Sequence, residues 1–462
     1  MAANIVTSAG LPVVDVRRAL YGGAALLGCG AVVLFAINQF TAGFVLLGLL
    51  AAPLIGFLCL AAPDAVLFVG ILTNFSDLPH KFGNPIIYFL LLLALLRRFL
   101  MRRPLLRIDA VVLSWAAMAL VTVLTIPRWN DVGKGIHGMQ YAFALPLSLY
   151  VLFQDDFVSA AGCRRFFTVY VPFAGAWMIV QVIALNLVNT IVSEHHWVTY
   201  RYGFDLGWTR SNTLAAIAVL IAAMILPNPL IKRQRAVVRL LYYTIATMLV
   251  GIALVIVSRG AIISLVAGAG MFVAFRALLE RRINIAKWAT TAAIGVFVLG
   301  VVLQKSLLAL IERFKDLKFD LSMLSRMYMI RDALLAIRRH PLIGVGPDQY
   351  RYNDFFLPQT DPHNLFLRYG VDIGGIAIII LLVLLAIPVV RNARLLRDDP
   401  QQGRALYALL MLPYLVALAN SQMEATLPLY HYGMLFWTLY AIAIRFARNA
   451  DQMGIVVSPA TS

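Results

Sequence analysis

The longest stretch without a charged side chain lies between Arg18 and Asp64. A helix that spans a bilayer needs about 20 mostly apolar residues, so this stretch predicts two spans, at 20–38 and 41–61. Across the chain 61% of the residues are hydrophobic and 13% are charged, whereas soluble domains have about 45–50% and about 25%. A soluble protein of this size could not hide so much apolar surface, so we predict a membrane protein.

Further apolar runs follow along the chain. They lie at 65–75, 84–96, 110–126, 138–153, 166–187, 211–227, 240–257, 261–275, 288–303, 371–390, 404–420 and 427–445. Unpaired backbone groups are too costly in lipid for anything but helices or a closed barrel, and these runs are too long and continuous for alternating barrel strands. We therefore predict an all-α polytopic membrane protein with 12–14 transmembrane helices. The short run at 65–75, which could be re-entrant, leaves the count open.

Basic residues predict the orientation of the chain. With the N-terminus in the cytoplasm, Lys and Arg gather in alternate loops, at 97–107, 232–239, 276–287 and 391–404, and are sparse in the short loops between them. Cytoplasmic loops carry the excess of Lys and Arg in membrane proteins, so both termini are expected in the cytoplasm. The net charge of +17 is then mainly an orientation signal and does not indicate a nucleic-acid partner.

One extramembrane segment is too long to be a turn. Residues 304–370 hold ten Lys and Arg and are expected on the outer, periplasmic face, between an N-terminal bundle of helices over 1–303 and C-terminal helices over 371–462. Apolar residues recur at helical spacing around 307–317 and 326–339, with basic residues between them. Such amphipathic helices lie in the membrane interface. Two interpretations stay open: a basic collar facing membrane lipids, and a lid over an anionic lipid substrate.

Motifs in and near this loop carry a family resemblance. Arg326 to Tyr350 reads RMYMIRDALLAIRRHPLIGVGPDQY, and Pro362 opens PHNLFLRYGVDIG. Together with Ser258-Arg259-Gly260 at an outer helix end, these motifs resemble the O-antigen ligase and Wzy-type polymerase superfamily, in detail over 240–390. The resemblance implies a GT-C-like architecture with a long, partly helical periplasmic loop.

The resemblance also implies an activity. Proteins of this superfamily take a glycan from undecaprenyl diphosphate on the periplasmic side of the bacterial inner membrane, with no cofactor and no metal. Ligases place the glycan on the lipid A-core of lipopolysaccharide, and polymerases place it on a saccharide repeat unit. Between these alternatives we lean toward a polymerase of surface or exported polysaccharide, for which polysaccharide-assembly proteins are potential partners.

Three arginines at outer helix ends suit the phosphates of such a donor. Arg201, Arg210 and Arg259 are the candidates, because a guanidinium stays charged and binds phosphate through two hydrogen bonds. Ser211 or Asn212 could cap the helix that follows Arg210, and Gly260 would permit a tight return after Arg259. The alternative for each is an arginine that only reaches the membrane interface. The resemblance implies that Arg210 and Arg259 bind the diphosphate, with Arg201 and Arg326 in support.

The resemblance implies that His363 is the catalytic base, and histidine can exchange a proton near neutral pH. Asn364 is expected to cap the next helix or to support the site. Asp361 and Asp372 could orient the imidazole, although helical spacing also lets Asp372 pair with Arg368. Asp372 stands where the superfamily often has Glu.

A metal site is not expected. Glu194-His195-His196 is a local cluster of candidate ligands, but adjacent histidines point apart on a helix and on a strand.

Two other classes of protein fit the hydropathy. A transporter of anionic solutes would predict ionisable residues within the spans, and the sequence has almost none. A membrane component of a polysaccharide export complex would need neither His363 nor paired arginines. An enzyme must bring Arg210, Arg259 and His363 to one place, which the other classes need not do.

Overall fold

The computed structural model describes residues 62–73, 75, 80–154, 158–193, 206, 209–280, 321–350, 362–424 and 430–447. The chain divides into two compact units, Met1–Val66 and Leu67–Ser462, and the account below concerns the second. The spans predicted at 20–38, 41–61 and 288–303 and the amphipathic stretch at 307–317 lie outside the described residues.

The described residues form helices joined by turns, with one isolated bridge between Leu206 and Thr209. The helices of the first half are α3 (Pro63–Thr73), α4 (His80–Leu100), α5 (Ala110–Val123), α6 (Val132–Met139), α7 (Leu145–Phe153), α8 (Ala160–Arg165), α9 (Val171–Ser193) and α10 (Ser211–Ile225). Those of the second half are α11 (Pro229–Lys232), α12 (Ala236–Val255), α13 (Arg259–Glu280), α16 (Leu321–Arg339), α17 (Leu365–Asp372), α18 (Gly375–Asp398), α19 (Pro400–Met423) and α20 (Tyr430–Phe446). Short 3-10 and π segments lie at Ile126–Arg128, Gln140–Ala144 and Phe166–Tyr170.

Six helical segments within the described residues are long and apolar enough to cross a membrane. They are Val132–Phe153, Ala160–Leu185, Ala236–Val255, Arg259–Leu279, Gly375–Asp398 and Gly403–Met423. The predicted class, an all-α polytopic membrane protein, is thereby confirmed. The total of 12–14 spans includes segments outside the described residues and stays a prediction.

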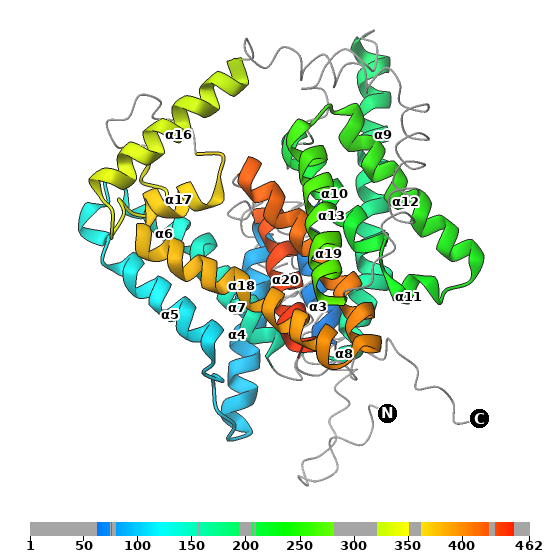
Figure 1. Cartoon of the computed structure of the whole chain (residues 1–462), viewed down its shortest axis with the longest axis horizontal. Coiled ribbons are helices and arrows are strands. Elements are labelled where there is room, and N and C mark those ends of the chain that lie inside the picture. Colours follow the sequence, from blue (N-terminus) through cyan, green and yellow to red (C-terminus); the bar gives the residue numbers. More distant parts are fainter. Residues whose placement is uncertain are drawn as a thin grey trace, which may run out of the picture. The chain divides into compact units, whose positions relative to one another are not determined.

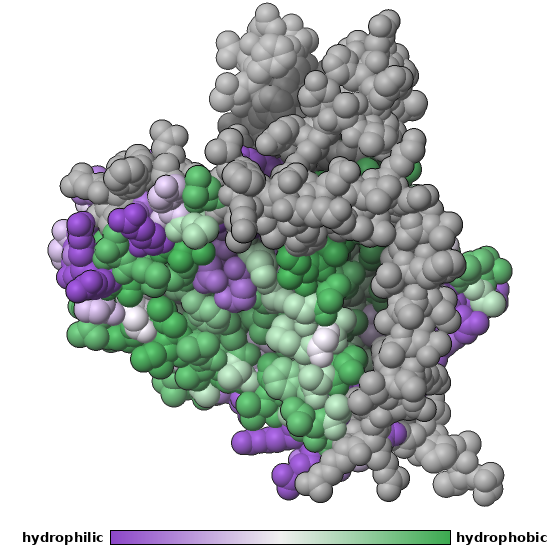
Figure 2. Space-filling view, turned by 45° about the horizontal axis from the view of Figure 1, so that its top comes forward, coloured by the Kyte–Doolittle hydropathy of each residue, from purple (hydrophilic) through white to green (hydrophobic). Residues whose placement is uncertain are grey.

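The surface of the helices is suited to lipid. Figure 2 shows a broad hydrophobic area over the described part of the chain, with hydrophilic residues gathered at its margins. Large apolar side chains such as Leu113, Phe173 and Ile379 are 58–65% exposed. Contiguous apolar patches of this kind are rare on soluble monomers, so the exposed faces match a hydrocarbon environment.

A turn separates the short helix α17 from the membrane helix α18 that follows it. α17 ends at Asp372, and Gly374 has a positive φ of 108°, a conformation that glycine adopts without steric cost. A side chain at Gly374 would also collide with the carbonyl oxygen of Leu342. The span predicted at 371–390 therefore begins at Gly375, and His363 precedes the short helix α17 instead of the membrane helix itself (Figure 1).

Helices α10, α13 and α19 pack against one another. From Leu214 to Ile225 every residue of α10 is buried. α13 approaches α19 at Gly268, where a built Cβ would stand 2.5 Å from the Cα of Val416. The close approach of α13 to α19 requires a residue without a side chain at position 268. It also fixes how the ends of α13 and α19 lie relative to each other.

We expect Gly268→Ala to lower the thermal stability of the purified protein, since an added methyl group against backbone forces the helices apart at a cost of about 1–3 kcal/mol. Gly270 is the matched control, because a Cβ built there meets no atom within 4 Å. Gly270→Ala should leave the unfolding temperature unchanged or raise it, as alanine favours helix by about 1 kcal/mol over glycine. Unfolding followed in detergent tests this, and equal temperatures for both variants would contradict the packing.

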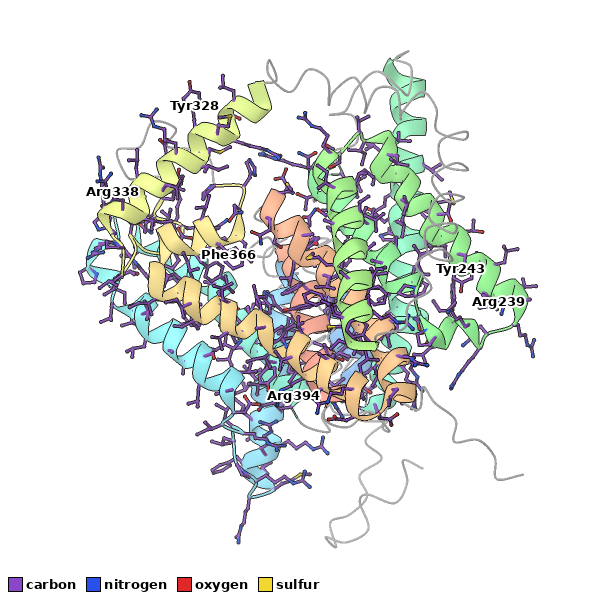
Figure 3. The ribbon with its side chains drawn as sticks, viewed as in Figure 1. Arg239, Tyr243, Tyr328, Arg338, Phe366 and Arg394 are labelled. Carbon is purple, nitrogen blue, oxygen red and sulfur yellow. The ribbon has the colours of Figure 1, made fainter. Side chains whose placement is uncertain are left out.

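The predicted inner loop 391–404 and helix α16 lie at different ends of the described bundle. Figure 3 places Arg394 in the lower part of the view, and Tyr328 and Arg338 of α16 in the upper part. This separation is what the charge pattern predicts for a loop on each side of a membrane. The orientation of the chain stays a prediction.

Candidate functional site

The turn between α12 and α13 places Arg259 at the first position of α13. Val257 donates its N–H to Leu254 (2.9 Å) and Ser258 donates to Ala253 (3.3 Å), the two hydrogen bonds of a Schellman helix end. The αL residue of this motif is Val257, with φ of 56°, where glycine is usual and a β-branched residue is an outlier. The tight return was predicted at Gly260, and this is wrong: Gly260 is helical, and Val257 makes the turn.

The start of α10 lies beside this turn. Arg210 occupies the N-cap position and is exposed, but no side chain caps the helix there, so the predicted caps Ser211 and Asn212 are wrong. Asn212 instead accepts from the hydroxyl of Ser258 at 3.5 Å. The contact joins the first turn of α10 to the residue before Arg259, which brings the segments carrying Arg210 and Arg259 together.

A carboxylate at the end of α19 links the remaining site residues. One oxygen of Glu424 binds Nη2 of Arg326 on α16, and the other lies 2.8 Å from Nδ1 of His363. The side chain of Glu424 is only 15% exposed. Its Cγ lies 3.9 Å from a Cβ built on Gly260, so this cluster adjoins the start of α13 and therefore Arg259.

Opposing effects act on the acidity of Glu424. Burial by itself would raise the pKa of this carboxyl, but the hydrogen bond and charge of His363 and the charge and hydrogen bond of Arg326 outweigh it, so its pKa is lowered from 4.5. Glu424 is thus ionised at neutral pH. Because its folded pKa is depressed, the stability it contributes is present above about pH 4.5 and is lost as the pH falls through the folded pKa.

His363 lies between Glu424 and the capped start of α17. Asn364 caps α17 by accepting from the N–H of Leu367 (3.1 Å) and donates to the side-chain oxygen of Gln422 (3.1 Å). If Nδ1 of a neutral imidazole donates to Glu424, the lone pair lies on Nε2. The side chain of His363 is 37% exposed, so a bound molecule can reach it. The arrangement resembles the carboxylate–imidazole pair that orients a general base.

Asp372 takes part in a different network. It lies 3.5 Å from Nε of Arg368, whose Nη2 binds Asp348 at 2.7 Å, and its carbonyl accepts from the N–H of Gly346 at 2.7 Å. The pairing with Arg368, left open by the sequence, is thus present, and the carboxylate at Nδ1 of His363 is Glu424. Arg201 and Asp361 lie outside the described residues.

The glycines of the PLIGVG motif explain how this loop packs on α17. A side chain at Gly344 would collide with the carbonyl oxygen of Val371, and Gly346 has φ of 113°. Nη1 of Arg128 donates to the carbonyls of Ile343 (2.6 Å) and Gly344 (3.0 Å). The motif therefore fixes the position of α17, and with it the backbone position of His363 just before that helix.

Within the described residues no group of three or more His, Cys, Asp or Glu side chains is arranged to hold a metal ion. The local cluster Glu194-His195-His196 lies outside them.

The fold and this cluster define a polytopic helical membrane protein with a polar site at one end of its central helices. Residues 248–382 match the family model described as O-Antigen ligase, which confirms the family resemblance found in the motifs. The matched segment contains Arg259, Arg326 and His363, whereas Arg210 and Glu424 lie outside it. A comparison with curated proteins finds no match. The matched segment, which is less than half of the chain, supports an O-antigen ligase/polymerase-type membrane enzyme.

Sequence reasoning missed Glu424. Its signal is a single acidic residue between the apolar runs 404–420 and 427–445. Ionisable residues in or beside membrane segments are rare and often functional, so the signal was present. Nothing in the sequence, however, pairs it with His363 or Arg326.

Proposed function

We propose that the protein is a GT-C-like, metal-independent glycosyltransferase that moves a glycan from undecaprenyl diphosphate to a saccharide acceptor on the periplasmic face of the bacterial inner membrane. The observation that carries this proposal is the cluster in which Glu424 joins His363 to Arg326 beside the start of α13. A base and several cations are what transfer from a lipid diphosphate requires.

In the proposed reaction the acceptor hydroxyl attacks the anomeric carbon of the donor glycan. A new glycosidic C–O bond forms as the C–O bond to the diphosphate breaks, and the diphosphate leaves with the bonding electron pair. The hydroxyl proton passes to Nε2 of His363, whose resulting imidazolium is stabilised by Glu424. The step consumes no oxidant, reductant or further co-reactant.

Arg210 and Arg259 are proposed to hold the diphosphate. Each stands at the N-terminal end of a helix, α10 or α13, where free N–H groups and the helix dipole favour anions. A guanidinium there adds charge-assisted, two-pronged hydrogen bonds to phosphate oxygens. Arg326, which binds Glu424, is proposed to help neutralise the negative charge of the leaving diphosphate.

The acceptor defines the second half of the proposal. We favour a saccharide repeat unit, so that the protein polymerises a surface or exported polysaccharide, with ligation to lipid A-core as the alternative. A strain that lacks the protein distinguishes them when lipopolysaccharide and free polymer are separated on a gel. Single repeat units indicate a polymerase, and unligated long chains indicate a ligase. A transporter or export component would leave purified donor and acceptor unreacted when both are added to the reconstituted protein.

Arg259→Lys and Arg210→Lys should each lower glycan transfer by about tenfold, because an ammonium keeps the charge but loses the fork that binds two phosphate oxygens. Arg394→Lys is the matched control, as Arg394 is exposed near the C-terminal end of α18, the end of that helix away from α17 and His363. Transfer by reconstituted protein at limiting donor measures the effect. A double Arg210→Lys, Arg259→Lys variant with full activity would remove both arginines from the donor site.

A further inference from the structure

The outer face of α16 carries large apolar side chains among permanent cations. Arg331 and Arg338 are exposed there, and so are five apolar residues that are 40–59% exposed: Leu324, Met327, Ile330, Leu334 and Leu335. The opposite face is buried through Met329, Asp332, Ala333 and Ala336. Figure 3 shows Tyr328 and Arg338 projecting from α16 on the side away from Phe366 of α17. A face of this mixture is suited neither to water nor to the hydrocarbon interior of a bilayer.

A shallow groove of about 420 Å³ runs along this face. It is lined by Met327, Ile330, Arg331, Leu334, Leu335 and Arg338. The two arginines are seven residues apart, which is two helical turns or about 10 Å along the axis, and so they lie on one side of the helix. None of the six described residues that line the groove is acidic.

We propose that this groove binds an anionic phospholipid of the surrounding bilayer. The lipid phosphate would lie between Arg331 and Arg338, whose planar guanidinium groups bind phosphate oxygens in pairs. One acyl chain would lie on the floor formed by Met327, Leu334 and their apolar neighbours. Helices with an apolar face and basic residues bind in the plane of the interface in this way, and each cation near anionic lipid adds to the affinity.

A second copy of the chain suits the groove less well. A symmetric contact would place the same patch on both partners, so Arg331 and Arg338 of one copy would face those of the other, and like charges repel. A phospholipid brings the opposite charge and an apolar chain at once. Since the inner side of α16 presents Arg326 to Glu424, a lipid bound outside would also hold the helix in the position that this ion pair requires.

The test uses the full-length protein in neutral detergent micelles that contain phosphatidylcholine, titrated with phosphatidylglycerol while the unfolding temperature is followed. Phosphatidylglycerol should raise the unfolding temperature, and an Arg331→Gln, Arg338→Gln variant should bind this lipid about thirtyfold more weakly. An Arg394→Gln, Arg397→Gln variant, which removes two exposed arginines of α18, is the matched control and should retain the wild-type response.

Three kinds of result would overturn the proposal. The first is a failure of the paired variants to differ, either because the α16 variant keeps the phosphatidylglycerol response or because the α18 control loses it equally. The second is an equal shift with inorganic phosphate, which would indicate a site for small anions. The third is a wild-type oligomer that dissociates in the α16 variant on light scattering, which would make the groove an interface between copies.

Discussion

His363→Ala should lose most glycan transfer while the protein still inserts and still binds donor. A general base contributes about 10²–10⁴-fold to rate, so the loss is expected in that range. The effect should fall on kcat, because the proposed diphosphate contacts come from Arg210 and Arg259 and do not involve the imidazole. Transfer by purified, reconstituted protein, with donor binding measured separately, checks both parts.

Two further histidine variants sharpen this test. His363→Gln keeps a hydrogen-bonding side chain but cannot accept the proton, so partial recovery would argue for positioning of the acceptor and no recovery for proton transfer. His137 is the control: its side chain is 59% exposed, lies 3.4 Å from Asp348 and belongs to no part of the cluster. His137→Gln should be fully active. Parental activity of a normally expressed His363→Ala would make His363 a residue of the helix start only.

Glu424→Gln should lower kcat by on the order of 10²–10⁴-fold, since loss of the charge of a carboxylate that orients a catalytic imidazole costs up to about 10⁴-fold. The variant is nearly isosteric, but it removes the charge that His363 and Arg326 share. We propose that Glu424 is a positioning residue that acts through His363. Because the imidazolium formed during transfer then lacks its counter-charge, the loss should fall on kcat and leave KM for the donor unchanged.

The split between kcat and KM separates this role from a purely structural one. A variant that only loosens α16 would also weaken donor binding and raise KM, because α16 carries Arg326. Glu424→Asp, which keeps the charge, should recover part of the rate, and Met423→Leu is the control on the neighbouring residue. A Glu424→Gln variant with the parental kcat would leave the carboxylate without a role in the reaction.

The sequence predicts the helices well because their signal is local. An apolar run such as 240–257 is long enough by itself to define α12 (Ala236–Val255), whatever surrounds it. The end of such a run depends on backbone geometry that hydropathy does not report. The positive φ at Val257 and Gly374 sets two turns, and the first of them falls on a residue that propensity would not select.

The site is less predictable from the sequence for a similar reason. Arg259 and His363 were found through motifs, each of which is continuous in the chain. Glu424 belongs to no such motif, and it meets His363 and Arg326 only after α19 has packed against α13. Helical packing decides which carboxylate reaches an imidazole, so Asp361 and Asp372 were the nearer candidates in sequence and Glu424 is the partner in space.

The position of Glu424 limits which segments of this protein can be exchanged with those of a relative. The segment that matches the family model ends at residue 382, within α18 (Gly375–Asp398), whereas the carboxylate that joins His363 to Arg326 comes from the end of α19. A chimera that receives residues 248–382 alone would contain His363 and Arg326. The residue that follows α19, at the position of Glu424, would come from the recipient protein. Swaps between enzymes of different acceptor preference should therefore take the whole stretch from α10 to residue 424 as the exchangeable unit.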